Sequence, residues 1–410
     1  MSKTSSDVNR ILVAKGLRGF GDGFVSLLLP AYLLELGFTP LQVGVIATTT
    51  LLGSGVMTLA VGLQAWRFHY RTWLLAATLL MAGTGLGFAL ATDFWPLLLI
   101  AFVGTLNPSS GDVSVFLPLE QALLSRIVDN QRRTAVMARY SLVGTLLAAF
   151  GALAAALPAL AAAAGGFSNR AAVQGMFVLY ALLALAAGAV YRGLPRAPGA
   201  AATVPEAPLH HSRKHVYTLA ALFSLDAFGG GFVVQSLVAL WLYQRFGLSI
   251  ATASAIFFWT GILTAFSYLV AARLALRFGL IKTMVFTHLP SSVCLILIPF
   301  MPHVSYAIVL LFIRSALSQM DVPTRSSYVM SIVPPAERAA AASVTSVPRS
   351  LASAVSPVLA GYLLGLSPFG WPFVAAGALK IVYDLLLLAM FHKVRPPEED
   401  PAASPARTPG

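Results

Sequence analysis

Charged and amide side chains interrupt several long apolar runs in this sequence. An ionisable group at the centre of a membrane helix costs about 2.5–3.5 kcal/mol to insert, so such groups usually pair or line a polar cavity. Their chemistry would be ion pairing, proton exchange or contact with a polar solute. The candidates for such a pathway are Arg18, Asp22, Asn107, Asp112, Asp226, Gln235, Arg314, Gln319, Asp321, Arg325 and Arg349.

Distance from a turn predicts two ion pairs. In an antiparallel helical hairpin, residues equally far from the turn lie at similar depth. This rule predicts that Glu120 pairs with Arg139 and that Asp321 pairs with Arg349. Either pair would serve equally well as a structural contact or as a gate. Removing one partner of a buried pair costs about 3–5 kcal/mol, because the other charge is stranded.

Three groups have no partner at equal depth in their own half of the chain, namely Asp22, Asp112 and Arg325. Burial favours the neutral form of a carboxylic acid, so Asp22 and Asp112 are candidates for proton exchange, with Asp22 preferred. Arg18 and Asp226 lie at comparable depths in corresponding helices and would form a gate if they pair across the halves. Arg325 is the preferred candidate for contact with a substrate or a gate.

The composition indicates that these groups lie in a membrane. Hydrophobic residues make up 58% of the 410 residues and charged residues only 10%, whereas soluble domains carry roughly 25% charged residues. The length accommodates about a dozen spans of ~20 residues. We expect an all-α polytopic membrane protein with twelve helices, among them continuous helices reaching to about residue 126 and over 216–245 and 305–332.

A repeat divides the chain into two halves. Residues 117–120 resemble residues 322–325 at a spacing of 205 positions, half the chain length, with Glu120 replaced by Arg325. Residues 20–25 and 228–233 correspond at nearly the same spacing. Six spans in each half place both copies in the same orientation, as parallel repeats. The predicted organisation is two six-helix bundles with a linker and a tail: 1–192, linker 193–214, 215–392, and a disordered cytoplasmic tail over 393–410.

Basic residues predict the orientation. One set of turns, together with the linker and the tail, holds most of the Lys and Arg, whereas the other set holds only Arg170 and Arg245. Since basic loops stay on the cytoplasmic side, both termini are predicted to be cytoplasmic. The net charge of +12 is therefore a topology signal, and no nucleic-acid partner is expected. The single cysteine, Cys294, permits no intrachain disulfide.

Two basic turns link these features to a known family. The turns after the second and eighth helices retain parts of a Gly-x-x-x-Asp-Arg-x-Gly signature, although Trp66 replaces the acid in the first copy. With two parallel six-helix halves, the chain resembles the major facilitator superfamily. The resemblance implies that helices 1, 4, 7 and 10 line a central cavity and that the halves rock by alternating access. The retained turn residues are Gly62, Arg67, Arg71, Arg277 and Gly279.

The expected function is secondary active, proton-coupled transport of a small molecule in the inner (cell) membrane. No phosphate-binding Walker pattern, metal motif or catalytic motif is present in the sequence, so no enzyme, cofactor or metal is expected. The alternatives are an uncoupled facilitator, a non-transporting receptor and, within transport, proton-coupled efflux of an amphipathic or anionic compound. The expected partners are the small molecule, protons and the lipid bilayer, with the protein as a monomer.

Overall fold

The computed structural model describes residues 3–64, 69–109, 114–128, 130–165, 168–195, 209, 212–334 and 337–392. Over these residues the chain folds into helices joined by short turns, and no strand is formed in them. The helices are α1 (Lys3–Glu35), α2 (Pro40–Gln64), α3 (Tyr70–Leu90), α4 (Phe94–Val103), α5 (Phe116–Ile127), α6 (Asn130–Ala154), α7 (Leu157–Ala163), α8 (Asn169–Arg192), α9 (Arg213–Gly231), α10 (Gln235–Phe246), α11 (Ile250–Phe278), α12 (Leu280–Leu297), η1 (Ile298–Phe300), α13 (Val304–Leu317), α14 (Asp321–Ile332), α15 (Arg338–Leu366) and α16 (Trp371–Phe391).

Nine stretches of the described residues are long and apolar enough to cross a membrane. Three of the nine each combine two consecutive helices, namely Val136–Ala163, Arg213–Phe246 and Leu280–Phe300. The other predicted spans correspond to α1, to α4 with α5, and to α13 with α14. The predicted count of twelve therefore depends on treating each interrupted pair as a single span.

The prediction of continuous fourth, seventh and tenth helices is wrong. α4 stops at Val103 and α5 starts at Phe116, α9 and α10 are separated by residues 232–234, and α13 and α14 by residues 318–320. Proline explains the break in the tenth helix. Pro323 has no N–H to bond the carbonyl four residues earlier, so it lies in the first turn of a new helix. In the seventh, three consecutive glycines precede the break, and glycine in a helix interior is destabilising.

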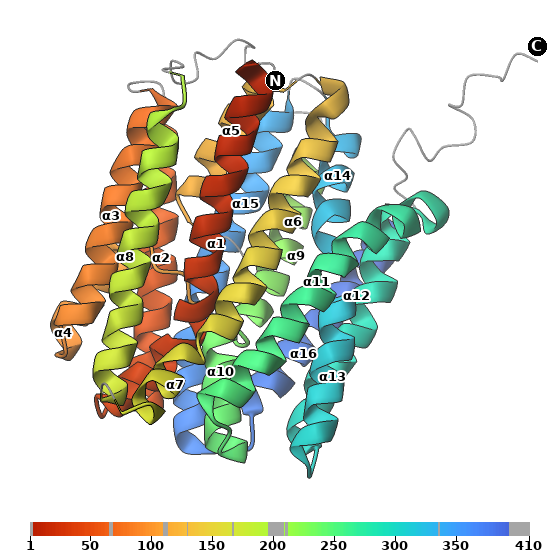
Figure 1. The fold of residues 1–410 in the computed structure, drawn as a ribbon. Coiled ribbons are helices and arrows are strands. Elements are labelled where there is room, and N and C mark those ends of the chain that lie inside the picture. The colour runs from red at the N-terminus through yellow and green to blue at the C-terminus, as the bar shows by residue number, and fades with distance from the viewer. Residues whose placement is uncertain are drawn as a thin grey trace, which may run out of the picture.

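The helices form one bundle with the N-terminus at one end (Figure 1). We call this the proximal end, and the opposite end, which holds turns 36–39, 247–249 and 367–370, the distal end. In the first half of the chain α1 packs against α6 and α8, and in the second α9 packs against α15 and α16. Between the halves, α2 packs on α15 and α6 packs on α11.

The two halves approach closely near the distal end. A Cβ atom added to Gly44 would lie 2.5 Å from the carbonyl oxygen of Pro357 and 3.0 Å from the Cα of Gly361. Beside this crossing, the Val358 N–H donates to Thr48 Oγ1 at 2.9 Å. Small residues allow helix backbones to approach this closely in membrane proteins. The crossing of α2 and α15 therefore depends on glycine.

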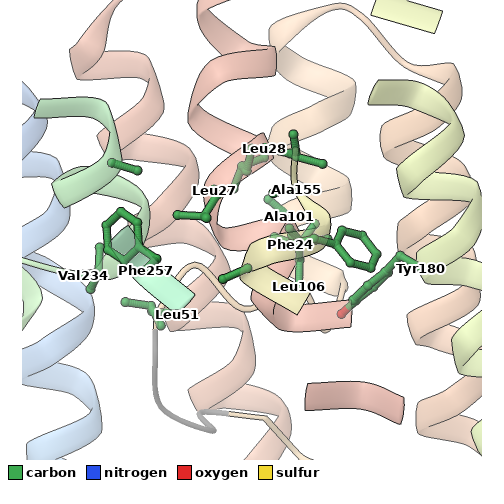
Figure 2. Close-up of a cluster of buried hydrophobic side chains, with 14 of the residues drawn as sticks. Phe24, Leu27, Leu28, Leu51, Ala101, Leu106, Ala155, Tyr180, Val234 and Phe257 are labelled. Carbon is green, nitrogen blue, oxygen red and sulfur yellow. The ribbon is translucent and has the colours of Figure 1, made fainter. Parts of the chain in front are cut away.

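One apolar cluster extends across the contact between the halves. Figure 2 shows Val234 and Phe257 of the second half near Leu27 and Leu51 of the first. All four belong to one connected set of buried side chains that also includes Phe24.

The exterior of the bundle is apolar, and charged groups are buried inside it. Leu90 and Trp95 are 80% and 74% exposed, whereas Glu120 and Asp384 are completely buried. A soluble protein shows the opposite distribution. The surface of the bundle is thus suited to lipid.

Candidate functional site

Charged residues inside the bundle gather into two separate clusters. The first half contributes Arg18, Glu120, Tyr140 and Tyr191, which we call the N-half cluster. The second half contributes Asp226, His288, Asp321, Arg325, Lys380 and Asp384, which we call the C-half cluster. Each residue of the two clusters is at most 9% exposed.

The N-half cluster is centred on Glu120 of α5. The guanidinium of Arg18, on α1, forms a salt bridge with Glu120 Oε2. The Tyr140 hydroxyl donates to the same oxygen at 2.6 Å, and the Tyr191 hydroxyl donates to Oε1. The ring of Phe116 lies 4.0 Å from Arg18 Cζ. With three donors, the carboxylate of Glu120 is fully engaged and joins α1, α5, α6 and α8.

The predicted pair between Glu120 and Arg139 is therefore wrong. Arg139 is exposed, and the next residue, Tyr140, is the one that contacts Glu120. The comparison of distances from the turn placed the partner of Glu120 within one residue of its true position along α6. It took no account of rotation about the helix axis, where one residue corresponds to about 100°.

Asp226 of α9 forms the centre of the C-half cluster. Its Oδ1 lies 2.6 Å from Lys380 Nζ, on α16, and its Oδ2 lies 3.2 Å from Arg325 Nη1, on α14. Arg325 also forms a salt bridge with Asp321, one turn earlier on its own helix. Arg325 Cζ lies 5.3 Å from the centre of the Phe223 ring. Arg325 is thus held between two carboxylates, whereas Lys380 pairs with Asp226 alone.

His288 of α12 links two carboxylates of this cluster. Its Nδ1 lies 3.0 Å from Asp384, on α16, and its Nε2 lies 3.6 Å from Asp226 Oδ1. The ring of Tyr383 meets His288 edge-on, with centroids 5.9 Å apart. A neutral imidazole carries one N–H, whereas the protonated ring carries two. Each ring nitrogen of His288 thus faces a carboxylate oxygen.

These contacts overturn three further expectations. Arg325, expected to lack a partner, forms salt bridges with Asp226 and Asp321. Asp321 pairs with Arg325 instead of Arg349, because residues four apart share a helix face. The predicted gate between Arg18 and Asp226 does not form, since each of these groups is paired within its own half.

Lys380, Asp384 and the role of His288 were not foreseen. Lys380 and Asp384 are four positions apart in the otherwise apolar helix α16, so they lie on one face. That spacing of opposite charges inside a span was a usable signal. His288 stands alone in its apolar run of sequence, because its acidic neighbours come from α9 and α16, far away in the chain.

Several other candidates have separate surroundings. Asp22 is half-buried and accepts a hydrogen bond from the Tyr180 hydroxyl at 3.3 Å. Asn107 Oδ1 accepts from the N–H and the hydroxyl of Ser109 within the turn after α4. Asp112 lies outside the described residues.

The basic-turn residues lie near the proximal end. Gly62 belongs to α2, and Arg67 lies outside the described residues. Arg71 Nη1 donates to the carbonyl oxygen of Leu194 at 3.4 Å. Arg277 is exposed. Gly279 has φ of +84° between α11 and α12, a conformation that favours glycine.

A cavity of about 80 Å³ lies between the halves. α6 of the first half and α10, α11 and α13 of the second contribute to its lining. The family resemblance implied the first, fourth, seventh and tenth helices, of which the seventh and tenth take part through α10 and α13. The polar residues around this central cavity are Thr145, Gln235, Thr260, Thr264, Arg314, Ser315, Ser318 and Gln319.

Comparison with known proteins decides the family. The model of the Major Facilitator Superfamily matches residues 11–237 and 219–409, which together cover nearly the whole chain. The chain belongs to the major facilitator superfamily. Its all-helical fold and its family make it an integral membrane protein that transports a small molecule.

Solved structures of superfamily transporters share this fold. A mutant of the nucleoside transporter NupG has a TM-score of 0.74 at 14% identity, covering 94% of this chain and 99% of that one. A bacterial homologue of the human lysosomal transporter Spinster, inward-facing and occupied, has a TM-score of 0.70 at 14% identity, covering 94% and 95%. The human organic anion transporter MFSD10 has a TM-score of 0.67 at 18% identity, covering 94% and 100%.

One relative in sequence is an uncharacterised membrane protein of Saccharomyces cerevisiae, YJR124C. It is 23% identical over 422 aligned residues, which cover 94% of each chain. The similarity therefore extends over both halves of the superfamily fold.

Proposed function

We propose that this superfamily member is a proton-coupled secondary transporter of the inner (cell) membrane, with both termini in the cytoplasm. Alternating access would expose the central cavity to one side at a time. The position of His288 between Asp226 and Asp384 is the observation that supports coupling. When His288 gains or loses a proton, its bonds to the two carboxylates change together.

The protonation of His288 bears on the cavity through two adjacent elements. Asp226 belongs to α9, which is followed in the chain by the cavity helix α10. Arg325 and Asp321 belong to α14, and Gln319 of the cavity lies two residues before Asp321. A change in the charge of His288 alters the electrostatic interactions of Asp226. It thereby changes the strength of the salt bridge between Asp226 and Arg325 of α14.

The charged groups that contact His288 or its partners come from three helices. α9 supplies Asp226, α14 supplies Asp321 and Arg325, and α16 supplies Lys380 and Asp384. Arg349 of α15 lies within electrostatic range of Asp226, Asp321 and Arg325. Asp384 forms its ion pair with His288.

Reconstitution tests this proposal. A ligand is first identified by thermal-shift screening, and its uptake into liposomes is then measured with and without a pH gradient. Wild-type protein is expected to accumulate it, with a limit of about tenfold per pH unit for one proton per substrate. His288→Gln keeps hydrogen-bonding groups but cannot titrate, so it should lose accumulation while keeping counterflow.

His303→Gln is the matched control, because His303 is exposed at the distal end. Asp22→Asn makes the same test for the N-half candidate. Accumulation by His288→Gln at the wild-type level would refute the role of His288. Counterflow whose rate does not depend on pH would indicate an uncoupled facilitator. Binding of the ligand without counterflow would indicate a receptor. The direction of substrate movement relative to protons separates symport from efflux by antiport.

A further inference from the structure

Arg314 differs from three other cations inside the bundle. Arg18, Arg325 and Lys380 each form a salt bridge with a carboxylate. Arg314, on α13, forms none within the described part of the chain, and its Nε is buried without a hydrogen-bond partner. Instead, its side chain lines the central cavity.

The cavity provides no counterion for this guanidinium. None of the described residues around the cavity is acidic. Removing a cation from water is costly unless an anion or hydrogen bonds compensate. A guanidinium stays charged at every physiological pH and offers five donors in a planar fork that matches carboxylate and phosphate oxygens.

We propose that Arg314 binds the anionic group of the transported molecule, so that the substrate is a small organic anion. This inference rests on the proposed function, in which the central cavity is the substrate site. The anionic group is a carboxylate, phosphate or sulfonate, whose oxygens the guanidinium contacts in pairs.

Two amide side chains complete the anion site. Gln319 Oε1 accepts a hydrogen bond from the Tyr268 hydroxyl at 3.4 Å, which leaves the amide NH₂ as a donor. Gln235, at the start of α10, also lines the cavity. Apolar residues also line the cavity, among them Val238 and Phe257. A cavity of about 80 Å³ holds a compact anionic group, and the apolar lining residues suit a small hydrocarbon body.

The test measures the thermal unfolding of the purified full-length protein in detergent. The probes are benzoate, phenyl phosphate and benzenesulfonate, with benzyl alcohol and benzylamine as the neutral and cationic counterparts. A ligand that binds only the folded state raises the unfolding temperature. At least one anion is expected to raise it by about 2 °C or more at saturation, whereas the neutral and cationic probes are expected to have no such effect.

Variants assign this effect to Arg314. Arg314→Gln should abolish the stabilisation by the anion. Arg314→Lys should retain part of it, because the charge remains but the fork is lost. Arg245→Gln is the matched control, since it removes the same charge from an exposed position at the end of α10. Gln319→Leu should weaken the effect and provides a second test if Arg314→Gln does not fold.

Three results would overturn the proposal: no stabilisation by any of the three anions, equal stabilisation by benzyl alcohol, or full stabilisation of Arg314→Gln. Counterflow of the stabilising anion, supplied in radiolabelled form to liposomes, separates this proposal from the proposed function. Stabilisation that depends on Arg314 but without counterflow would support anion recognition and refute transport. Counterflow of benzylamine without anion stabilisation would support transport and refute anion recognition.

Discussion

The two buried clusters differ in how completely their charges are engaged. In the N-half cluster a single carboxylate, Glu120, has one cationic partner and two tyrosine donors. In the C-half cluster, three carboxylates share Arg325, Lys380 and a titratable imidazole. We interpret the N-half cluster as a structural contact that stays paired. We interpret the C-half cluster as the one that changes its charge during transport.

Glu120→Gln is expected to destabilise the protein. The substitution leaves the guanidinium of Arg18 buried without a counterion, which costs about 3–5 kcal/mol. Arg139→Gln is the control, because Arg139 is exposed on the next position of α6 and should change stability by less than about 0.5 kcal/mol. Chemical or thermal unfolding in detergent measures both variants. A larger loss for Arg139→Gln would restore the pairing expected from the sequence.

Single residues also show where sequence reasoning reached its limit. The charged positions Arg18, Glu120, Asp226, Asp321 and Arg325 were recognised as buried functional candidates, because charges in apolar runs are conspicuous. Their partners were mostly assigned wrongly, because depth along a helix does not fix the direction in which a side chain points. Contacts between α9, α12 and α16 depend on tertiary packing, which no local pattern encodes.

At the scale of the elements, the close crossing of α2 and α15 has a specific consequence. Gly44→Leu should prevent the halves from closing at the distal end, because even a Cβ at this position would lie 2.5 Å from a backbone oxygen of α15. Transport should fall at least about tenfold while the protein still inserts, since the strain is confined to one crossing. Counterflow in liposomes measures the loss.

Gly55→Leu provides the control in the same helix. No atom lies within 4 Å of a Cβ built at Gly55, so this substitution should leave counterflow unchanged. Equal loss of counterflow in both variants would show that added bulk in α2 is harmful wherever it lies, and that the crossing has no special role.

The elements were predicted well in position and less well in continuity. Apolar runs and their turns located the spans from α1 to α16, because hydropathy follows directly from composition. The breaks within the fourth, seventh and tenth spans were missed, although Pro108, Pro323 and glycines 229–231 were visible in the sequence. Proline and glycine occur in both continuous and broken membrane helices, since neighbouring helices can satisfy the freed backbone groups.

On the scale of the whole molecule, the distribution of basic residues makes a prediction about topology. Green fluorescent protein fused after His392 is expected to fluoresce in a bacterial host, because basic segments remain cytoplasmic, where this reporter folds. Fused after Gly247, beyond α10, it should stay dark, whereas alkaline phosphatase at the same place should be active. Whole-cell fluorescence and phosphatase assays measure the two sets of fusions. The reverse pattern would place the termini outside.

The repeat predicted the relation between the halves but not the difference in their chemistry. Glu120 and Arg325 occupy corresponding positions, and both form buried salt bridges. In the first half the partner comes from α1, whereas in the second the partners come from α9 and from α14 itself. The duplicated backbone thus carries two different charge arrangements.

The salt bridge between Asp226 and Lys380 also bears on how the protein is made. Lys380 is synthesised 154 residues after Asp226, which takes roughly 8–30 s at typical rates of translation. During this interval α9 enters the membrane with a carboxylate whose ammonium partner does not yet exist. The last helix, α16, therefore completes the assembly of the second half. A chain that ends before Trp371 lacks both Lys380 and Asp384. A membrane quality-control protease would therefore recognise it as incompletely folded.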